Sequence, residues 1–236
     1  MSQHHLHTHS GVRIPYQLKV SAKRRTIGLR IDANGLTVHT PRRVPQSTLD
    51  KLLQDKVDWI LRKLSEWQEQ PPAFAWCDGA TLQYLGNDIR LTLRQDARNR
   101  TPTLDGTELV VAQPDPADLA AVKRKVALWY AKEARSDFTR RIELLAAKLG
   151  VPTPPVYLSN AKTRWGSCNS RGEIRLHWRL VQAPPHVIHY VVAHELAHLK
   201  EMNHSPQFWA WVAKLCPEYE QAKTTLKTLS RTLHLI

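Results

Sequence analysis

In the amino-terminal half of the chain, apolar and polar residues alternate along short segments. Val12, Ile14 and Tyr16 begin this alternation, in which every second side chain points to the same face of a strand. Three dipeptides of the kind that favours tight hairpin turns separate such segments: Asn34–Gly35, Gly86–Asn87 and Asp105–Gly106. The pattern therefore predicts a β-rich region over residues 11–113.

One helix is expected to interrupt these strands. Between Leu49 and Trp67 apolar residues recur every three or four positions, which is the period of an amphipathic helix. Ser47 precedes the run as an N-cap candidate, and Pro71–Pro72 follows it. We expect a helix from Ser47 whose apolar stripe packs into the core.

From Asp115 onwards the pattern becomes mostly helical. Asp115–Pro116 has the form of an N-cap followed by proline at the first helical position, and Gly150 marks the end of that helix. Val156–Leu158 and Ile174–Val181 have the composition of strands. Further helices are expected to open at Pro184–Pro185, at Ser205–Pro206 and at Pro217. The fold class is therefore α+β, with a β-rich amino-terminal half followed by a helical domain with a small sheet over residues 114–236.

The helix after Pro185 is apolar around much of its circumference, as expected of a helix buried in the centre of a domain. It contains the sequence His194-Glu-Leu-Ala-His198. Four residues make slightly more than one turn, so both imidazoles project from one face. Burying them together with a carboxylate would be costly without a compensating partner. The pattern predicts a metal site with one Zn²⁺ per chain.

A catalytic zinc needs a third protein ligand, and His204 is the strongest candidate. Residues 200–203 are expected to finish the helix, with Asn203 in the left-handed conformation that reverses the chain and brings His204 to the same point. Two alternatives, Glu218 and Glu220, lie on the last expected helix and are more typical of solvated positions. His189 should face away from the ligand pair, by about 140° of helical rotation.

Glu195 follows His194 by about 100° of helical rotation, which places its carboxylate beside the metal rather than on it. It is the predicted general base, which takes a proton from a zinc-activated water and delivers it to the leaving group. Charge that develops in the transition state needs a further donor. His177, Arg164 and Tyr190 are the polar candidates nearest in sequence.

Just before the strand expected from Ile174 to Val181, the segment Lys162–Cys168 has the composition of a tight glycine turn. A strand that leads into the zinc helix could bind an extended peptide along its edge. The alternative is that Arg164, Trp165 and Cys168 only pack the turn against the helix. Cys168 is not expected to act as a nucleophile, because no separate His and Asp pair is evident for it.

The composition of the chain narrows its expected binding partners and cellular compartment. Lys and Arg number 34 against 21 for Asp and Glu, so the formal charge of +13 favours contact with nucleic acid or acidic proteins, although a solvated surface also explains it. The three scattered cysteines argue against a disulfide framework, and no apolar run is long enough for a membrane span or signal. We expect a cytoplasmic protein without membrane contact, and a disordered His-rich tail over residues 1–10.

Three segments taken together resemble the YgjP-like metallopeptidase family, which is related to SprT-like zincins: KTRWGSC, IRLHWRLV, and the stretch with HELAH followed by NHS. The resemblance implies a zincin-like catalytic domain in which His194, His198 and His204 bind zinc and Glu195 is the base. Metzincins share the ligand spacing but have glycine where this chain has Glu201. They also need a later Met turn, whereas Met1 and Met202 are the only methionines here.

The leading functional hypothesis is a zinc-dependent metallohydrolase that cleaves peptide bonds. Because relatives in this family have been assigned nucleotide pyrophosphatase activity, hydrolysis of UTP to UMP and diphosphate is the alternative, although no phosphate-binding motif is evident. A third reading is a basic, DNA-associated binding protein with structural zinc. Structural zinc is usually closed by four ligands, and only three are evident here.

Overall fold

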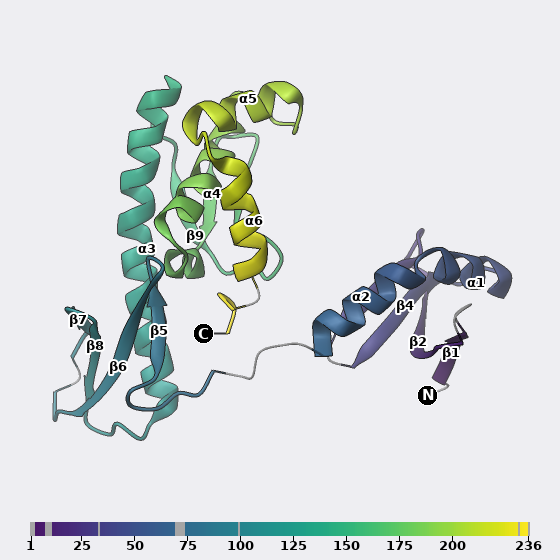
Figure 1. The fold of residues 1–236 in the computed structure, drawn as a ribbon, viewed down its shortest axis with the longest axis horizontal. Coiled ribbons are helices and arrows are strands. Elements are labelled where there is room, and N and C mark those ends of the chain that lie inside the picture. The colour runs from purple at the N-terminus through teal and green to yellow at the C-terminus, as the bar shows by residue number, and fades with distance from the viewer. Residues whose placement is uncertain are drawn as a thin grey trace. The chain divides into compact units, whose positions relative to one another are not determined.

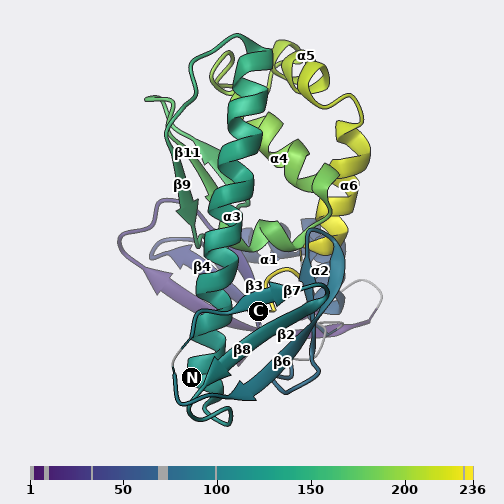
Figure 2. The same cartoon turned by 90° about the vertical axis from the view of Figure 1, so that its left-hand side faces the viewer.

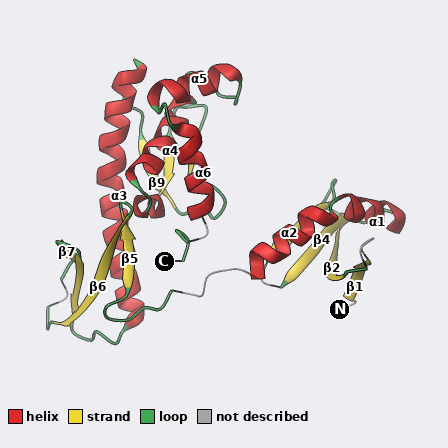
Figure 3. Cartoon of the chain, in the orientation of Figure 1, coloured by secondary structure: helices red, strands yellow, loops and turns green. Residues whose placement is uncertain are grey.

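The computed structural model describes residues 3–7, 11–32, 34–68, 74–98, 100–230 and 232–235. The chain forms two compact units, residues 1–72 and 73–236 (Figure 1). This boundary differs from the one expected between residues 113 and 114, because the strands from residue 81 onwards pack with the helical region in a single core. The α+β fold class is confirmed (Figure 3).

The first unit is a four-stranded sheet with two helices. Its strands lie in the order β1-β2-β4-β3. Their bounds are Gln3–His7 (β1), Arg13–Ser21 (β2), Gly28–Asp32 (β3) and Gly35–Pro41 (β4). The helices α1 (Gln46–Asp55) and α2 (Val57–Gln68) supply Leu49, Leu53 and Ile60 to the same apolar core as the sheet.

Two expectations for this unit are wrong. The tail expected to be disordered contains β1, which pairs antiparallel with β2, and its Leu6 is only 4% exposed. One apolar residue among histidines therefore anchors the strand. Residues 1–2 and 8–10 of the expected tail lie outside the described part of the chain. The helix expected from Ser47 is two helices separated at Lys56, and no side chain caps α1 at Pro45.

The second unit begins with another four-stranded sheet, in the order β5-β6-β8-β7. Its strands are Thr81–Tyr84 (β5), Asn87–Gln95 (β6), Thr103–Asp105 (β7) and Glu108–Gln113 (β8). Both four-stranded sheets have a central parallel pair flanked by antiparallel strands, a repeated topology that the hydrophobic pattern did not reveal. The three expected hairpin turns are confirmed.

The long helix α3 (Leu119–Leu149) connects this sheet to the rest of the unit (Figure 2). Asp118, not Asp115, caps it by accepting a hydrogen bond from the Ala121 backbone N–H at 3.0 Å. Asp115 instead closes a local turn by accepting from the Ala117 N–H. Gly150 ends the helix in the left-handed conformation, as expected, with φ of 69°.

A three-stranded sheet and three helices complete the unit. The strands β9 (Val156–Ser159), β10 (Gly166–Cys168) and β11 (Ile174–His177) lie in the order β10-β11-β9. They are followed by the 3₁₀-helix η1 (Trp178–Gln182), α4 (Pro185–Ala197), α5 (Pro206–Leu215) and α6 (Tyr219–Leu229). The strand expected to reach Val181 stops at His177, because the His177 side chain accepts from the Arg179 N–H and begins η1.

Helix α4 occupies the centre of this unit. It packs against α3, α5, α6 and β10 (Figure 2), which explains why nine of its 13 residues are buried. The turn between β5 and β6 lies against the residues that precede α4: a Cβ on Gly86 would lie 2.8 Å from the Pro184 Cα. Among the described residues, no helix combines the length and apolar content needed to cross a lipid bilayer.

Candidate metal centre

Helix α4 carries two of the three histidines that the sequence singled out. His194 lies in its last turn and His198 is its C-cap residue. The helix ends at Ala197, so the expectation that it continues to Asn203 is wrong. Asn203 is also not left-handed; instead its side-chain oxygen accepts from the Ser205 N–H at 2.9 Å.

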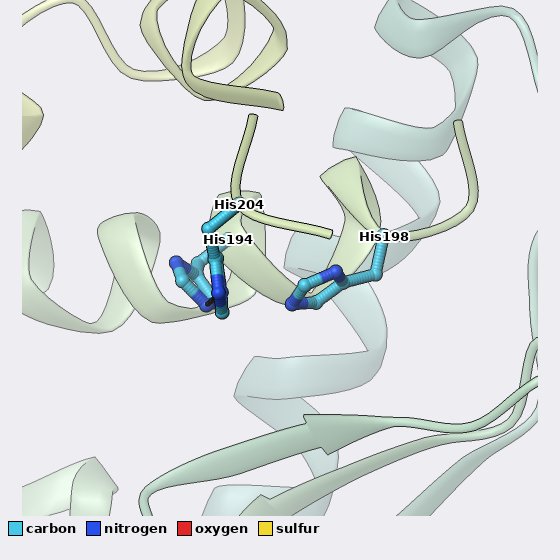
Figure 4. A group of neighbouring side chains, drawn as sticks. All are labelled: His194, His198 and His204. Atoms are coloured by element: carbon cyan, nitrogen blue, oxygen red, sulfur yellow. Dashed lines mark hydrogen bonds between the residues drawn. The ribbon is translucent and has the colours of Figure 1, made fainter. Parts of the chain in front are cut away.

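The turn after α4 returns His204 to the other two histidines (Figure 4). Ser205 starts α5 by accepting a hydrogen bond from the Phe208 N–H, which fixes the turn from its far side. The nearest ring nitrogens of the three histidines all lie within 4.8 Å of one another. The structure therefore brings together the ligand set that the sequence predicts.

The donor atoms fit a metal ion. The Nε2 atoms of His194 and His204 are 3.2 Å apart, close to the roughly 3.4 Å expected of two nitrogens on one tetrahedral zinc. His198 Nδ1 lies 3.2 Å from the carbonyl oxygen of Glu201, a contact that fixes the ring and leaves Nε2 free to bind. Burial lowers the pKa of His194 to about 4, so its imidazole stays neutral, as a ligand must be.

Phe208 supports all three histidines, a role that we did not predict from the sequence. Its side chain is fully buried, and its ring centroid lies 4.9, 4.6 and 4.7 Å from those of His194, His198 and His204. Its position in the first turn of the helix that begins directly after His204 and Ser205 is the signal that could have identified it.

Glu195 follows His194 in α4 and is 5% exposed. Burial raises the pKa of its carboxyl to about 8, while the positive charge of Arg164 opposes that rise. The side chain rests against the backbone of Gly166 in β10. A Cβ at that position would lie 2.6 Å from the Glu195 Cγ and 2.7 Å from its Cδ, so only glycine leaves room for the carboxylate.

The alternative ligands are not part of this cluster. Among the described residues, the group that could hold a metal contains neither Glu218 nor Glu220, and Glu220 lies 4.0 Å from Lys223. His189 faces elsewhere, as expected, with its Nε2 at 3.1 Å from the carbonyl oxygen of Leu215. His177 is 1% exposed and packs against Trp165 and His234 rather than the histidine triad.

Two of the three candidate donors lie close enough to Glu195 to interact with it electrostatically. Arg164 is exposed and lowers the pKa of Glu195. Burial raises the pKa of Tyr190 to about 12, with Glu220 and Glu195 adding to the effect, so its hydroxyl keeps its proton and can donate. Cys168 is also near Glu195; burial raises the pKa of its thiol to about 11, which disfavours the thiolate a nucleophile needs.

The strand edge next to the site differs from the expected one. β11 lies in the middle of its sheet, paired with β10 on one side and β9 on the other, so it has no edge to offer. β10, which carries Gly166, is one of the two outer strands, and no described strand other than β11 pairs with it. Glu195 lies against a face of this strand, on the side to which a Cβ of Gly166 would point.

Comparisons with known proteins support a metal-dependent enzyme. The family model described as "YgjP-like, metallopeptidase domain" matches residues 25–229. UTP pyrophosphatase of Escherichia coli (strain K12) is 29% identical over 129 residues, which cover 49% of this chain and 72% of that protein.

Two solved structures are similar to part of the chain. They are crystal structures of metallopeptidase zymogens, abylysin of Pyrococcus abyssi and jannalysin of Methanocaldococcus jannaschii. Their identities are 28% and 21%, and their TM-scores are 0.37 and 0.33. The matches cover 41% and 39% of this chain and 94% and 96% of those chains, respectively.

Proposed function

The chain belongs to the YgjP-like metallopeptidase family, and on that premise we propose that it is a zinc-dependent peptidase in which Glu195 acts as general base. Membership of the family supports a hydrolase that depends on a metal ion. The identity of the metal, the peptide substrate and the roles of the individual residues are our proposal.

His194, His198 and His204 would hold the ion. When bound, zinc supplies Lewis-acid chemistry that activates a water molecule and polarises a carbonyl group. Among the described residues, the group of metal-binding side chains contains three members, whereas structural zinc is usually closed by four. The set therefore favours a catalytic over a structural role.

Glu195 would move the proton. Glu195 follows His194 in α4 and is outside the group of three histidines, and from its buried position its carboxylate would accept a proton from water and pass it to the leaving amine. Tyr190, whose hydroxyl remains protonated, and Arg164 are the nearby groups able to donate to an oxygen that gains negative charge.

The contact between Glu195 and β10 is the observation that carries the choice of a peptide. β10 has an unpaired outer edge in the described part of the chain, and its Gly166 touches the Glu195 side chain. An extended peptide that adds to this edge by backbone hydrogen bonds would lie beside the strand whose face contacts the general base. The same geometry gives no comparable reason for a nucleotide.

The substitution Glu195→Gln tests the proposal, because it removes the base and keeps the shape. We expect the variant to retain one zinc per chain and to lose peptide cleavage by about 10²-fold or more. Glu143→Gln, the same change at an exposed position of α3, is the matched control and should cleave as the wild type does. Wild-type cleavage by Glu195→Gln would refute the role of Glu195.

Hydrolysis of UTP to UMP and diphosphate is the second candidate, favoured by the relative named UTP pyrophosphatase. Two cations lie near the site and could contact a triphosphate: Arg164 beside Glu195, and Lys223, whose Nζ lies 4.7 Å from the ring centroid of Trp209. Diphosphate release from UTP, lost in Glu195→Gln and weakened in Lys223→Gln, would support this activity. Peptide cleavage without diphosphate release would exclude it.

A further inference from the structure

A basic groove lies on α3, away from the candidate metal centre. It encloses about 330 Å³ between the amino-terminal half of the helix and the loop from β6 to β7. Figure 2 shows the β6 and β8 strands at one end of α3, whereas α4 and α5 pack towards its other end. The groove and the histidine cluster are thus separate sites within the second unit.

Positive charge dominates this groove. Four of the residues that line it are cationic, namely Arg100, Arg124, Lys125 and Lys132, and none is acidic. Asp96 lies nearby and forms an ion pair with Arg100 at 2.8 Å, so it neutralises one of these charges. The groove keeps a positive excess that must be met by solvent ions or by an anionic ligand.

Lys125 is fixed in place before any ligand arrives. Its Nζ donates to the carbonyl oxygens of Ala112 and Arg100, at 2.6 and 2.9 Å. An ammonium group has three N–H donors, so one is left over from these two bonds. Burial lowers the pKa of Lys125, which means that its charge is incompletely solvated and would gain from an anion in the groove.

Two of the other cations form a row along the helix with an exposed leucine between them. The row consists of residues at intervals of four, which share one face of the helix and span about 12 Å: Arg124, Leu128 and Lys132. Leu128 is 70% exposed at the centre of this row, and Arg135 extends the same exposed face. The row is therefore suited to an elongated anion rather than to a single small one.

We propose that this groove binds the phosphate backbone of nucleic acid without reading its sequence. Successive phosphates of one strand are about 3.4 Å apart along the axis, so a row of about 12 Å covers several of them. Trp129, the aromatic residue of the groove, is only 4% exposed, so the groove offers no accessible aromatic side chain as an anchor for a protein partner. Charge therefore has to supply most of the affinity. This inference does not depend on the proposed peptidase activity.

The test measures how binding depends on salt. A fluorescein-labelled DNA duplex of random sequence is titrated with the 236-residue chain at several salt concentrations, and the logarithm of affinity is plotted against the logarithm of salt. Each lost phosphate contact lowers the slope by about 0.9. For the double variant Arg124→Gln/Lys132→Gln we expect a slope smaller by about 1.8 and an affinity at 0.1 M salt reduced on the order of tenfold or more.

Lys148→Gln/Lys227→Gln removes the same charge from exposed positions elsewhere in the second unit and should leave the slope unchanged. Equal slopes for the wild type and the groove variant would overturn the proposal. Tighter binding of poly-glutamate than of DNA, lost in the groove variant, would also overturn it, by indicating an acidic protein partner. Zinc content and hydrolysis are measured on the same preparations, so a failure here is distinguishable from a failure of the proposed function.

Discussion

Replacing Gly166 by alanine should disturb Glu195 directly. The added methyl group would lie 2.6 and 2.7 Å from the Cγ and Cδ atoms of Glu195, closer than carbon atoms approach in folded proteins. Gly166 does not have positive φ, so alanine fits the backbone and the effect comes only from this contact. Because α4 and β10 are both packed on other elements, we expect the carboxylate to move rather than the backbone.

Overpacking of this kind costs about 1–3 kcal/mol, which for a chain of this size corresponds to a fall of roughly 2–12 °C in Tm. The effect on hydrolysis should be larger. A displacement of about 1 Å at a catalytic group can lower the rate about 10²-fold. The assays are thermal unfolding, zinc content and kcat on the best available substrate, and we expect zinc content to stay at one per chain.

Gly28→Ala is the matched control. Its added methyl would meet only the guanidinium end of the Arg24 side chain, which is exposed and can move. Its Tm and kcat should equal those of the wild type. If Gly166→Ala lowers Tm but leaves kcat unchanged, then the position of Glu195 does not matter for catalysis. If it changes neither, the contact between β10 and Glu195 is wrong.

Phe208→Ala should destabilise the fold by about 3–5 kcal/mol, because its ring is fully buried, and should lower zinc occupancy, as checked by denaturant unfolding and metal analysis. Arg141→Ala should lower the free energy of unfolding by about 2 kcal/mol, because it breaks a 2.6 Å ion pair with the buried Asp137. Arg140→Ala should lower it by less than about 1 kcal/mol, because Arg140 is 74% exposed. Equal losses of stability in denaturant unfolding would contradict this contrast. Burial, and then the charge of His234, lowers the pKa of His177 from 6.5 to about 4, so the unfolded chain takes up the proton first. The free energy of unfolding should therefore fall between about pH 6.5 and pH 4, by on the order of 3 kcal/mol, and His177→Asn should flatten that decline in a pH series of unfolding curves.

The candidate metal centre could be predicted from the sequence because its three histidines lie close together along the chain. His194 and His198 are one helical turn apart, and Ser205–Pro206 fixes where the next helix begins, so the spacing alone constrains the position of His204. The hairpin turns were predictable for the same reason: Gly86 and Gly106 adopt positive φ, which glycine accepts without strain.

Contacts between segments that are distant in the sequence could not be predicted from it. The role of Gly166 depends on its distance from Glu195, and the end of the strand at His177 depends on a side chain that competes with the strand for the Arg179 N–H. Residues 3–7 form β1 because one leucine finds the core of the first unit, which local composition cannot indicate. The domain boundary was misplaced because two sheets of the same topology belong to different units.

The central claim is that the three histidines bind one zinc ion. The most direct test is metal content, by mass spectrometry, of three tag-free proteins: the wild type, His204→Ala, and a variant in which the amino-terminal histidines His4, His5, His7 and His9 are replaced by glutamine. We predict one zinc per chain in the wild type and in the glutamine variant, and its loss in His204→Ala. Zinc that persists in His204→Ala, or that disappears with the amino-terminal histidines, would contradict the account.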